Sequence, residues 1–496
     1  MKPRYLHSMA RKPNKKRTYG RRNYLKAVTA TGLMGLAGCT GGGGDGGDGG
    51  DGDGGDGGST PTATPGSTGT PMTGDGPNYS EYEGTEITFA MSGWLEPIIN
   101  PLIEQFGKET GIEVSVSTIP HNDFLPRALN MFRSRQTDFD MFTSDVIWTG
   151  SFMAPEFAEP LGPRMNDPNL AMPGYNWDGH LPVIQAFHGM WDGKRYGFPW
   201  WGAFWAHLIR KDVLEEHADE YESQHDESIL PPDPLVGYES YEKFDRVAKF
   251  MNDQGWKISL EATNGWNIGY WYDSRFSGVT KSARMITREN GNYKSQLGKP
   301  GAKKALQHYV DEVDWAQNPL STGISKSQQQ FMNGDTWSVE HGGSAALSAI
   351  DEYGYEEGLR IGNTPGRWSN LGGFSWIINS FSDERKKDAA FLFAQWATSE
   401  KIQKETFLRE GIGPTRPAVL TEEVKQQHPF GRYIDPAENP HIKTMAIRPK
   451  NPKFVELQDV MQTRFSAALS GQAGVQETID TVHNRWQEIL ADLESS

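Results

Sequence analysis

The chain has 496 residues, which is too long for one compact hydrophobic core, so we expect at least two domains or lobes. Its 49 Lys and Arg stand against 64 Asp and Glu, for a net charge of −15. Such an acidic chain repels nucleic acid and anionic lipid, which argues against nucleic-acid binding as a function. The chain has one cysteine, Cys39, so no internal disulfide bond is expected.

The first 38 residues have the order of an export signal: a basic stretch, a short apolar stretch and small residues. The apolar stretch is shorter than the ~20 residues that a membrane-spanning helix needs, and no later stretch reaches that length. The letters RRNYLK at residues 21–26 resemble a twin-arginine (Tat) motif, and LAGC at residues 36–39 resembles a lipobox. These resemblances imply a signal peptide over residues 1–38 and a lipid anchor on Cys39. The alternative is a free buried thiol that follows a chance arginine pair.

Residues 39–83 have the composition of a disordered tether. Residues 41–58 hold thirteen Gly and five Asp, and residues 59–77 are rich in Thr, Pro, Gly and Ser. Neither stretch can bury enough apolar surface to offset the entropy that is lost on ordering. The acidic body, the twin-arginine motif and the tether together resemble haloarchaeal exported proteins.

From residue 86 the sequence alternates between strand and helix patterns. We expect a strand, a helix, a strand, a helix and a strand at residues 87–91, 98–106, 112–119, 124–135 and 139–146. This order predicts a parallel sheet with right-handed crossovers, hence an α/β lobe whose ligand binds at the carboxyl ends of the strands. Ser92 and Trp94 follow the first strand. Asp145 and Trp148 lie at the carboxyl end of the third.

The rest of the chain continues in a mixed pattern. We expect an extended segment at residues 206–210, a helix-rich region over residues 238–318, and helices near residues 386–398, 454–470 and 474–493. Four tryptophans lie inside helical patterns, and we assign them to packing: Trp256, Trp315, Trp396 and Trp486.

Five segments, in this order, resemble the extracellular solute-binding proteins of family 1, the maltose-binding-like class that delivers sugars to ABC importers. They are FDMFTSDVIWTGSFM (139–153), WDGKRYGFPWWGAFWAHLIRKDVL (191–214), QFMNGDTWSVEHGGSAAL (330–347), GGFSWIINSFSDERKKDAAFLFAQWATSEKIQK (372–404) and GIGPTRPAV (411–419). The resemblance covers residues 86–490. It implies an α/β, two-lobe, periplasmic-binding-protein-like fold of type II, with each lobe a mostly parallel sheet flanked by helices and the ligand cleft between the lobes. The expected N-terminal lobe comprises residues 84–206 and 355–380, and the expected C-terminal lobe comprises residues 207–354 and 381–496.

A sugar site needs aromatic rings for the C–H faces of the sugar, and carboxylate, amide and guanidinium groups for its hydroxyls. We expect twelve ligand-binding residues, most of them carried over from the resemblance: Ser92, Trp94, Glu96, Asp145, Trp148, Trp201, Trp205, Trp271, His341, Gly373, Phe374 and Arg416. Asp145 could instead cap the next helix, and Arg416 could pair with a surface acid. Trp271 could line the second lobe or fill its core. His341 stands where many members of the family have an aromatic residue.

The resemblance implies an exported, lipid-anchored protein on the outer face of the cytoplasmic membrane. Such a protein captures a mono- or oligosaccharide by lobe closure and delivers it to the permease of an ABC importer. Nucleotide-binding, nucleophile-elbow and zinc-protease motifs are missing from the sequence, and we expect no enzymatic activity, no cofactor and no metal in a monomer. Two alternatives stay open: an exported glycosidase-like enzyme with Asp145 and Glu340 as paired carboxylates, and a solute-binding sensor module for a non-sugar ligand.

Overall fold

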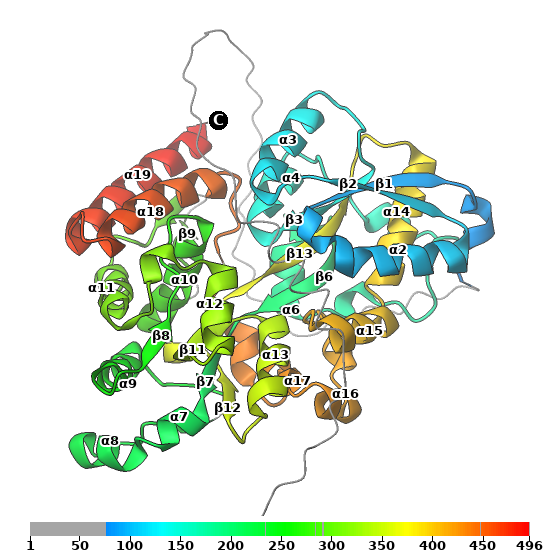
Figure 1. Cartoon of the computed structure of the whole chain (residues 1–496). Coiled ribbons are helices and arrows are strands. Elements are labelled where there is room, and N and C mark those ends of the chain that lie inside the picture. The colour runs from blue at the N-terminus through cyan, green and yellow to red at the C-terminus, as the bar shows by residue number, and fades with distance from the viewer. Residues whose placement is uncertain (1–75, 234, 283, 290–291, 447, 496) are drawn as a thin grey trace, which may run out of the picture. The chain divides into compact units, whose positions relative to one another are not determined.

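The computed structural model describes residues 76–495, except 234, 283, 290–291 and 447 (Figure 1). The expected signal peptide, Cys39 and most of the expected tether lie outside the described residues. The described part contains two larger β-sheets, one of five strands and one of four. None of the described helices is both long enough and apolar enough to span a bilayer.

The five-stranded sheet has the strand order β2-β1-β3-β13-β6. Its strands are β1 (Glu86–Met91), β2 (Glu113–Thr118), β3 (Met141–Asp145), β6 (Gly197–Phe204) and β13 (Leu371–Ile378). The first three pair in parallel, as the β-α-β-α-β pattern predicts, whereas β13 runs antiparallel to both β3 and β6. The carboxyl ends of β1, β2 and β3 therefore lie at the same end of the sheet.

Two pairs of helices cover the two faces of this sheet (Figure 1). α2 (Glu96–Thr110) and α14 (Glu384–Ala397) pack on one face, and α3 (His121–Arg133) and α4 (Thr149–Met153) pack on the other. Side chains of β1 alternate between them: Phe89 lies 6.0 Å from the ring of Phe393 in α14, and Ala90 belongs to the core on the α3 side. α2 ends where the sequence predicts, because Gly111 adopts the left-handed conformation (φ 73°) that caps a helix.

The four-stranded sheet has the strand order β12-β7-β11-β8. Its strands are β7 (Ala206–Arg210), β8 (Lys257–Ser259), β11 (Thr336–His341) and β12 (Leu359–Gly362). β7 is antiparallel to both of its neighbours, and β8 is parallel to β11. Both sheets thus contain antiparallel pairs beside parallel ones, and β7 and β13 each follow a strand of the other sheet in the chain.

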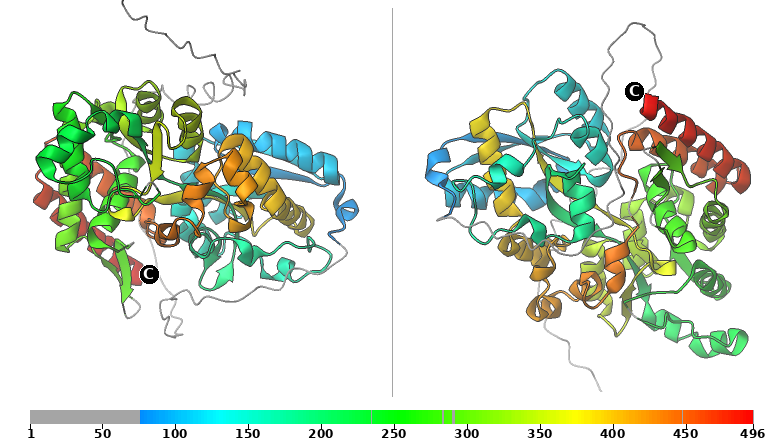
Figure 2. Two further views of the ribbon diagram at one scale, coloured as in Figure 1. Left: turned by 90° about the horizontal axis from the view of Figure 1, so that it is seen from below. Right: turned by 180° about the vertical axis from the view of Figure 1, so that it is seen from behind.

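Helices pack around the four-stranded sheet and extend beyond it. They are α7 (Lys211–Glu215), α8 (Ala218–His225), α9 (Tyr241–Asp253), α10 (Trp266–Thr280), α11 (Pro300–Trp315), α12 (Ile324–Met332), α13 (Gly343–Tyr353), α18 (Phe454–Leu469) and α19 (Val475–Ser495). Phe244 of α9 packs on β11 through Trp337, with ring centroids 6.0 Å apart. The last two helices, which the sequence predicts, pack against α10 and α11, and Figure 2 shows them in red beside the green helices.

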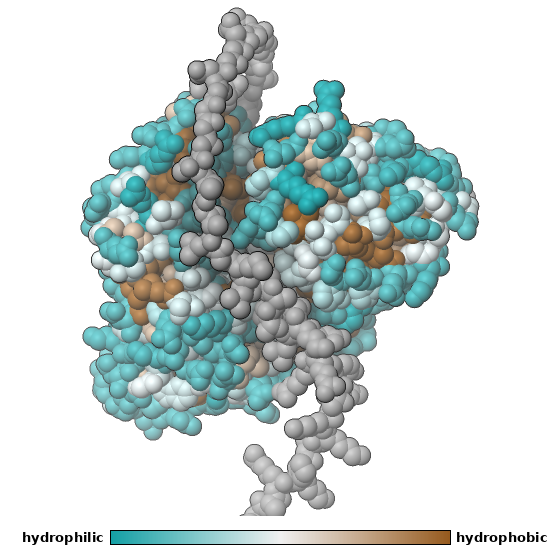
Figure 3. Space-filling model, turned by 45° about the horizontal axis from the view of Figure 1, so that its top comes forward, coloured by the Kyte–Doolittle hydropathy of each residue, from teal (hydrophilic) through white to brown (hydrophobic). Residues whose placement is uncertain are grey.

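Further helices and strands lie between or beside these elements. They are α5 (Gly162–Met165), α6 (Pro182–Ile184), α15 (Glu400–Glu410), α16 (Glu422–Gln427), α17 (Phe430–Ile434), β4 (Met190–Trp191), β5 (Lys194–Arg195), β9 (Ile286–Glu289) and β10 (Asn292–Ser295). The face of the molecule in Figure 3 is largely hydrophilic, with small separate hydrophobic areas. Among the described large apolar side chains, Leu320 is exposed, whereas most others lie in the two cores.

Three segments meet between the two sheets, and hydrogen bonds join them to one another. Trp205 alone links β6 to β7, residues 363–370 link β12 to β13, and a third segment leads into α18. The Trp205 amide donates to the Asn370 carbonyl (3.1 Å), and the Leu371 amide donates to the Ala446 carbonyl (2.9 Å). The segments that connect the sheets are therefore tied together by main-chain hydrogen bonds.

The lobe boundaries expected from the sequence differ from sheet membership in two places. β12 falls in the expected N-terminal lobe, at 355–380, but it pairs with β7 in the four-stranded sheet. α14 falls in the expected C-terminal lobe, at 381–496, but it packs on the five-stranded sheet. Partner strands lie far apart in the chain, and their pairing leaves no local pattern in the sequence.

The end of the expected tether is part of the folded body. Tyr79–Tyr82 forms a short 3-10 helix, and the ring of Tyr79 lies 6.2 Å from that of Phe106. The Tyr82 hydroxyl donates to Asp388 of α14 (3.2 Å). The expectation of disorder up to residue 83 is therefore wrong for residues 79–82, because Tyr79 packs its ring near Phe106 and Tyr82 bonds to Asp388.

Candidate functional site

Five rings form a first aromatic cluster at the carboxyl ends of β1, β2 and β3. Its members are Trp94, His121, Trp148, Trp201 and Phe374. The ring centroids of Trp94, Trp201 and Phe374 lie 5.6–5.7 Å from one another, and His121 stacks on Trp148 at 4.9 Å. The topology therefore brings four of the expected site residues together with one histidine that the sequence analysis did not select.

The backbone at Gly373 makes this cluster possible. Between Phe374 and Ser375 the pairing of β13 with β6 shifts by one residue, so that Trp200 is the extra residue of a β-bulge. Gly373 has φ +119°, and a Cβ atom there would lie 2.0 Å from the Trp201 carbonyl oxygen. Only glycine fits this backbone, which explains the Gly-Gly-aromatic pattern in the sequence.

Polar groups lie next to the first aromatic cluster. Asp145 ends β3, and its Oδ2 is 3.9 Å from His121 Nε2. The Ser92 hydroxyl is 3.3 Å from His121 Nδ1. Burial lowers the pKa of His121, and it lowers the pKa of the nearby His188 to about 4, so both imidazoles are neutral at pH 7. Asp145 is then the one formal charge that these residues contribute.

Four rings form a second aromatic cluster on the side of the four-stranded sheet. Its members are Trp205, Tyr270, Trp271 and His341. Trp205 lies at the centre, with ring centroids 4.9 Å from Tyr270, 5.0 Å from Trp271 and 5.3 Å from His341. Burial lowers the pKa of His341 to about 4, and its Nδ1 accepts from the Gly342 amide (2.9 Å). Three expected site residues thus meet here, contributed by a crossing segment, by α10 and by β11.

Arg448, which the sequence analysis did not select, contacts both regions. Its Nη2 lies 3.5 Å from Asp145 Oδ1, and its guanidinium carbon lies 4.7 Å from the centre of the Tyr270 ring. The Arg448 side chain is only 2 % exposed, and its Nε and Nη1 have no hydrogen-bond partner among the described residues. A buried guanidinium with two unpaired donors is costly unless other polar groups meet it.

Other unpaired polar groups gather around Arg448. The Tyr270 hydroxyl and Asp273 Oδ1 are buried without a partner among the described residues. Asn370 donates its side-chain amide to the Tyr270 carbonyl (3.0 Å) and to Asp273 Oδ2 (3.2 Å). Donors and acceptors thus gather around Arg448, an arrangement that suits a ligand with many hydroxyl groups.

The contacts of Asp145 and Trp271 fit both a ligand-binding role and a structural role. Asp145 Oδ1 accepts from the Ile147 amide (3.1 Å), so it does cap the short helix that follows β3, and the same carboxylate faces Arg448. Trp271 is buried in the second aromatic cluster and also lines an internal pocket. Their contacts with a ligand stay predictions.

The structure places Arg416 away from both aromatic clusters. Its guanidinium donates to the carbonyls of Thr398 (2.6 Å) and Asn176 (2.7 Å) and stacks over Tyr175. Among the described residues it forms no ion pair with an acid, and the neighbouring Thr415 hydroxyl donates to the Pro199 carbonyl of β6 (3.0 Å). Glu96 begins α2 and is half-buried.

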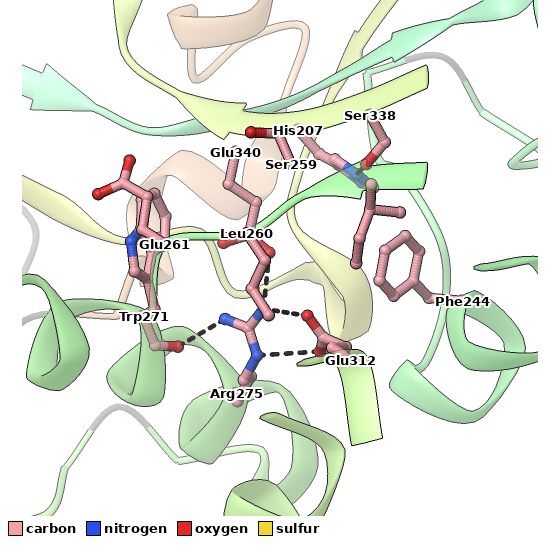
Figure 4. Close-up of a pocket in the computed structure, with 11 residues that line it drawn as sticks. His207, Phe244, Ser259, Leu260, Glu261, Trp271, Arg275, Glu312, Ser338 and Glu340 are labelled. Atoms are coloured by element: carbon pink, nitrogen blue, oxygen red, sulfur yellow. Dashed lines mark hydrogen bonds and ion pairs between the residues drawn. The ribbon is translucent and has the colours of Figure 1, made fainter. Parts of the chain in front are cut away.

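The internal pocket of the second sheet holds several acids around one arginine (Figure 4). Arg275 donates through Nε to Glu312 (3.0 Å), through Nη1 to the Trp271 carbonyl (2.9 Å), and through Nη2 to Glu312 again. Glu340 lies 3.6 Å from Arg275 Nη2, and burial raises its pKa to about 7. Burial also raises the pKa of Glu261 to about 7. The pocket is therefore a closed polar network beneath the second aromatic cluster.

His121 and Arg448 were not among the expected site residues, and the sequence carries a signal for His121 but none for Arg448. His121 begins α3, three residues after the end of β2, so the rule that ligands bind at carboxyl ends of strands points to it as well as to Ser92 and Asp145. Arg448 lies in an irregular segment before α18, and no periodic pattern in the sequence connects it with Asp145. Only the contact between residues 303 positions apart reveals it.

Comparison with known proteins identifies the family. The family model described as "Bacterial extracellular solute-binding protein" matches residues 101–431. The sn-glycerol-3-phosphate-binding periplasmic protein UgpB of Rhizobium meliloti is 24% identical over 442 residues, which cover 83% of this chain and 95% of that protein.

Solved structures share the fold. Maltose-bound MalE3 of T. maritima has a TM-score of 0.67 at 21% identity and covers 82% of this chain and 100% of its own. A solute-binding protein of Agrobacterium radiobacter in complex with ribitol has a TM-score of 0.68 at 18% identity, with 82% and 99% covered. These matches confirm the two-lobe, type II binding-protein fold. Because the family model matches well over half of the residues, the chain belongs to the bacterial extracellular solute-binding protein family.

Proposed function

We propose that this protein is the substrate-binding component of an ABC importer and that it captures a carbohydrate or polyol between its two sheets. The observation that carries the proposal is the position of Arg448, which contacts Asp145 beside the first aromatic cluster and Tyr270 of the second. Its Nε and Nη1 donors have no partner among the described residues and could meet ligand oxygens. Relatives named for binding glycerol 3-phosphate, maltose and ribitol support a polyhydroxyl ligand.

The ligand would use the two kinds of group differently. Ring faces of the first aromatic cluster, such as that of Trp201, would stack on C–H faces of the sugar. The Asp145 carboxylate would accept hydrogen bonds from hydroxyls, and Arg448 would donate to their oxygens. Each hydroxyl can both donate and accept, so a carboxylate beside a guanidinium offers complementary partners to neighbouring hydroxyls.

Capture would follow from closure of the two sheets about the segments that connect them. A ligand shifts an open–closed equilibrium only through its preference for the closed form, which completes contacts from both sides. Asp145 belongs to the five-stranded sheet and Tyr270 to the helices beside the four-stranded sheet, with Arg448 in contact with each. A ligand that touches Asp145 and Arg448 together would favour this closed arrangement.

Export follows from membership of an extracellular family. We further propose that the mature chain is a monomer held at the outer face of the membrane by lipid on Cys39. The expected product is a mature protein that begins at Cys39 and partitions into detergent, measured by intact-mass spectrometry of membrane extracts. A Cys39→Ser chain should be released in soluble form.

The direct test is a thermal-shift and calorimetric screen of the full chain with ribitol, mannitol, maltose and glycerol 3-phosphate. We expect saturable stabilisation by at least one of these compounds without product formation. Sustained turnover of an oligosaccharide would instead favour the alternative of an exported glycosidase-like enzyme. If none of the probes stabilises the protein or binds to it, the proposed function is contradicted.

A matched pair of variants tests the role of Asp145. Asp145→Ala should weaken binding by about 1–3 kcal/mol, because it removes a buried acceptor. Asp138→Ala makes the same charge change at an exposed position just before β3, and it should leave affinity unchanged. Equal affinities of the two variants in folded protein would remove Asp145 from the site.

A further inference from the structure

Residues 78–80 match the acceptor motif of asparagine-linked glycosylation. Asn78, Tyr79 and Ser80 fit the pattern Asn-X-Ser/Thr with X other than proline, and no other asparagine of the 496-residue chain does. A match of three residues is a weak signal by itself, because such a short pattern arises easily by chance. Its place in the fold decides whether a modifying enzyme can reach the asparagine and whether the side chain has another purpose.

The side chains of Asn78 and Ser80 are exposed and interact with each other. The Ser80 hydroxyl donates to Asn78 Oδ1 (2.7 Å). Asn78 precedes the 3-10 helix Tyr79–Tyr82, where an asparagine side chain often caps the helix, but it forms no capping hydrogen bond. Among the described residues, Asn78 Nδ2 has no hydrogen-bond partner. The fold therefore makes no use of the nitrogen that would carry a glycan.

The main chain around the motif is held against the folded body. The Asn78 amide donates to the Asn169 carbonyl (3.3 Å), and the ring of the next residue, Tyr79, lies 6.2 Å from that of Phe106. The Tyr82 hydroxyl donates to Asp388 (3.2 Å). These contacts present the Asn78 side chain outward at a defined place on the surface.

The motif lies at the end of the five-stranded sheet that is opposite the first aromatic cluster. Tyr79–Tyr82 comes just before β1, and the cluster lies at the carboxyl end of that strand. The six residues of β1 separate its two ends by about 17 Å at ~3.3 Å per residue. Figures 1 and 2 show the first described residues in the deepest blue, on the side away from the helices of the second sheet. A glycan on Asn78 would therefore leave the proposed binding site open.

We propose that Asn78 is a site of N-linked glycosylation in the exported protein. The donor would be a lipid-linked oligosaccharide phosphate, used by a membrane transferase that acts outside the cell. The bond between the sugar C1 and the phosphate oxygen breaks, and that oxygen keeps the electron pair. A bond forms between C1 and Asn78 Nδ2, which releases one proton. The glycan adds hydrophilic bulk at the surface, and the inference depends on export but not on the identity of the ligand.

The test uses the full chain, isolated from the membranes of cells that export it. Tandem mass spectrometry of the peptide that contains Asn78 should show a glycan in most molecules, and the intact mass should exceed that of the bare chain by at least one sugar residue. Asn169 is an internal control, because it is exposed and hydrogen-bonded to the motif but is followed by Ala171 where an acceptor needs a hydroxyl. Asn169 should carry no glycan.

Matched changes at Ser80 test the dependence on the motif. Ser80→Ala keeps Asn78 but removes the hydroxyl, and it should abolish the glycan. Ser80→Thr keeps a hydroxyl, and it should preserve the glycan. Asn78→Gln removes the acceptor and should lower the intact mass by as much as Ser80→Ala does. All three variants should bind ligand as the wild type does, because the motif lies at the other end of the sheet from the aromatic cluster.

The outcomes are independent of the proposed ligand. An unmodified Asn78 peptide in the exported chain would overturn the inference. So would a glycan on Asn78 that persists in Ser80→Ala, or an equal modification of Asn169. Each of these results would leave the solute-binding function in place, because the ligand screen tests that function separately. A failed ligand screen beside a glycan on Asn78 would contradict the proposed function and support this inference.

Discussion

Arg275 and Arg448 are both buried beside tyrosine rings and carboxylates, yet they use their donors differently. Each of the three nitrogens of Arg275 meets an acceptor, two of them in a bidentate pair with Glu312. Arg448 has one contact with Asp145 at 3.5 Å and leaves Nε and Nη1 unpaired among the described residues. A saturated guanidinium stabilises the fold, whereas one with spare donors is available to a ligand.

Replacing Arg275, Arg416 and Arg448 in turn by leucine tests this contrast, through the effect of each change on stability and on ligand binding. Arg275→Leu should have the largest effect on stability, a loss of about 3–5 kcal/mol, because it leaves the carboxylate of Glu312 buried without its partner. Urea denaturation of the full chain measures the loss. A stability within about 1 kcal/mol of wild type would contradict the view that the pair holds the second core together.

Arg416→Leu should have the next largest effect. It removes the donors of the Thr398 and Asn176 carbonyls, and we expect a loss of about 2–3 kcal/mol. The affinity of the folded fraction for a ligand should not change. Unchanged stability with a lost ligand response would return Arg416 to the binding site that the family resemblance implies for it.

Glu340, on the edge of the Arg275 network, should make stability depend on pH. Burial raises its pKa from 4.5 to about 7, Arg275 opposes the rise, and the charges of Glu312 and Glu261 add to it. The folded state therefore binds more protons than the unfolded state between about pH 4.5 and 7, and stability should fall as pH rises through that window, by about 3 kcal/mol in all. Glu340→Gln should flatten this part of the curve in urea titrations at several pH values. Two results would contradict a raised pKa for Glu340: a wild-type stability that rises between pH 5 and 7, or a Glu340→Gln variant whose stability depends on pH as steeply as that of the wild type.

Arg448→Leu should cost the least stability, about 1 kcal/mol, since few hydrogen bonds of the folded state depend on it. Its effect should appear instead as loss of the thermal shift with the probe that stabilises the wild type. Arg448→Lys keeps the charge without the planar fork of donors and should recover only part of the affinity. If Arg448→Leu shows the same thermal shift with that probe as the wild type, Arg448 has a structural role, like Arg275 and Arg416, and does not bind the ligand.

The elements of the first lobe could be predicted from the sequence, because they depend on interactions between residues that are close together in the chain. Strands, helices and the Gly111 cap follow from apolar periodicity and from the conformational freedom of glycine, which act over a few residues. Ser92, Trp94, Asp145 and Trp148 were selected because they follow parallel strands, and the structure does bring Trp94 and Trp148 into one aromatic cluster with Asp145 beside it.

The sequence by itself determined the β-α-β-α-β order, the final pair of helices and the set of polar and aromatic residues at strand ends. Only the tertiary structure decided which sheet β12 and α14 join, and which arginine meets Asp145. Arg416 and Arg448 look alike in the sequence, each beside a proline in an irregular stretch. The difference lies in their neighbours: carbonyls saturate two donors of Arg416, whereas Arg448 reaches a carboxylate 303 residues away. A charged group acquires its role from the partners that neutralise it, and long-range packing alone sets those partners.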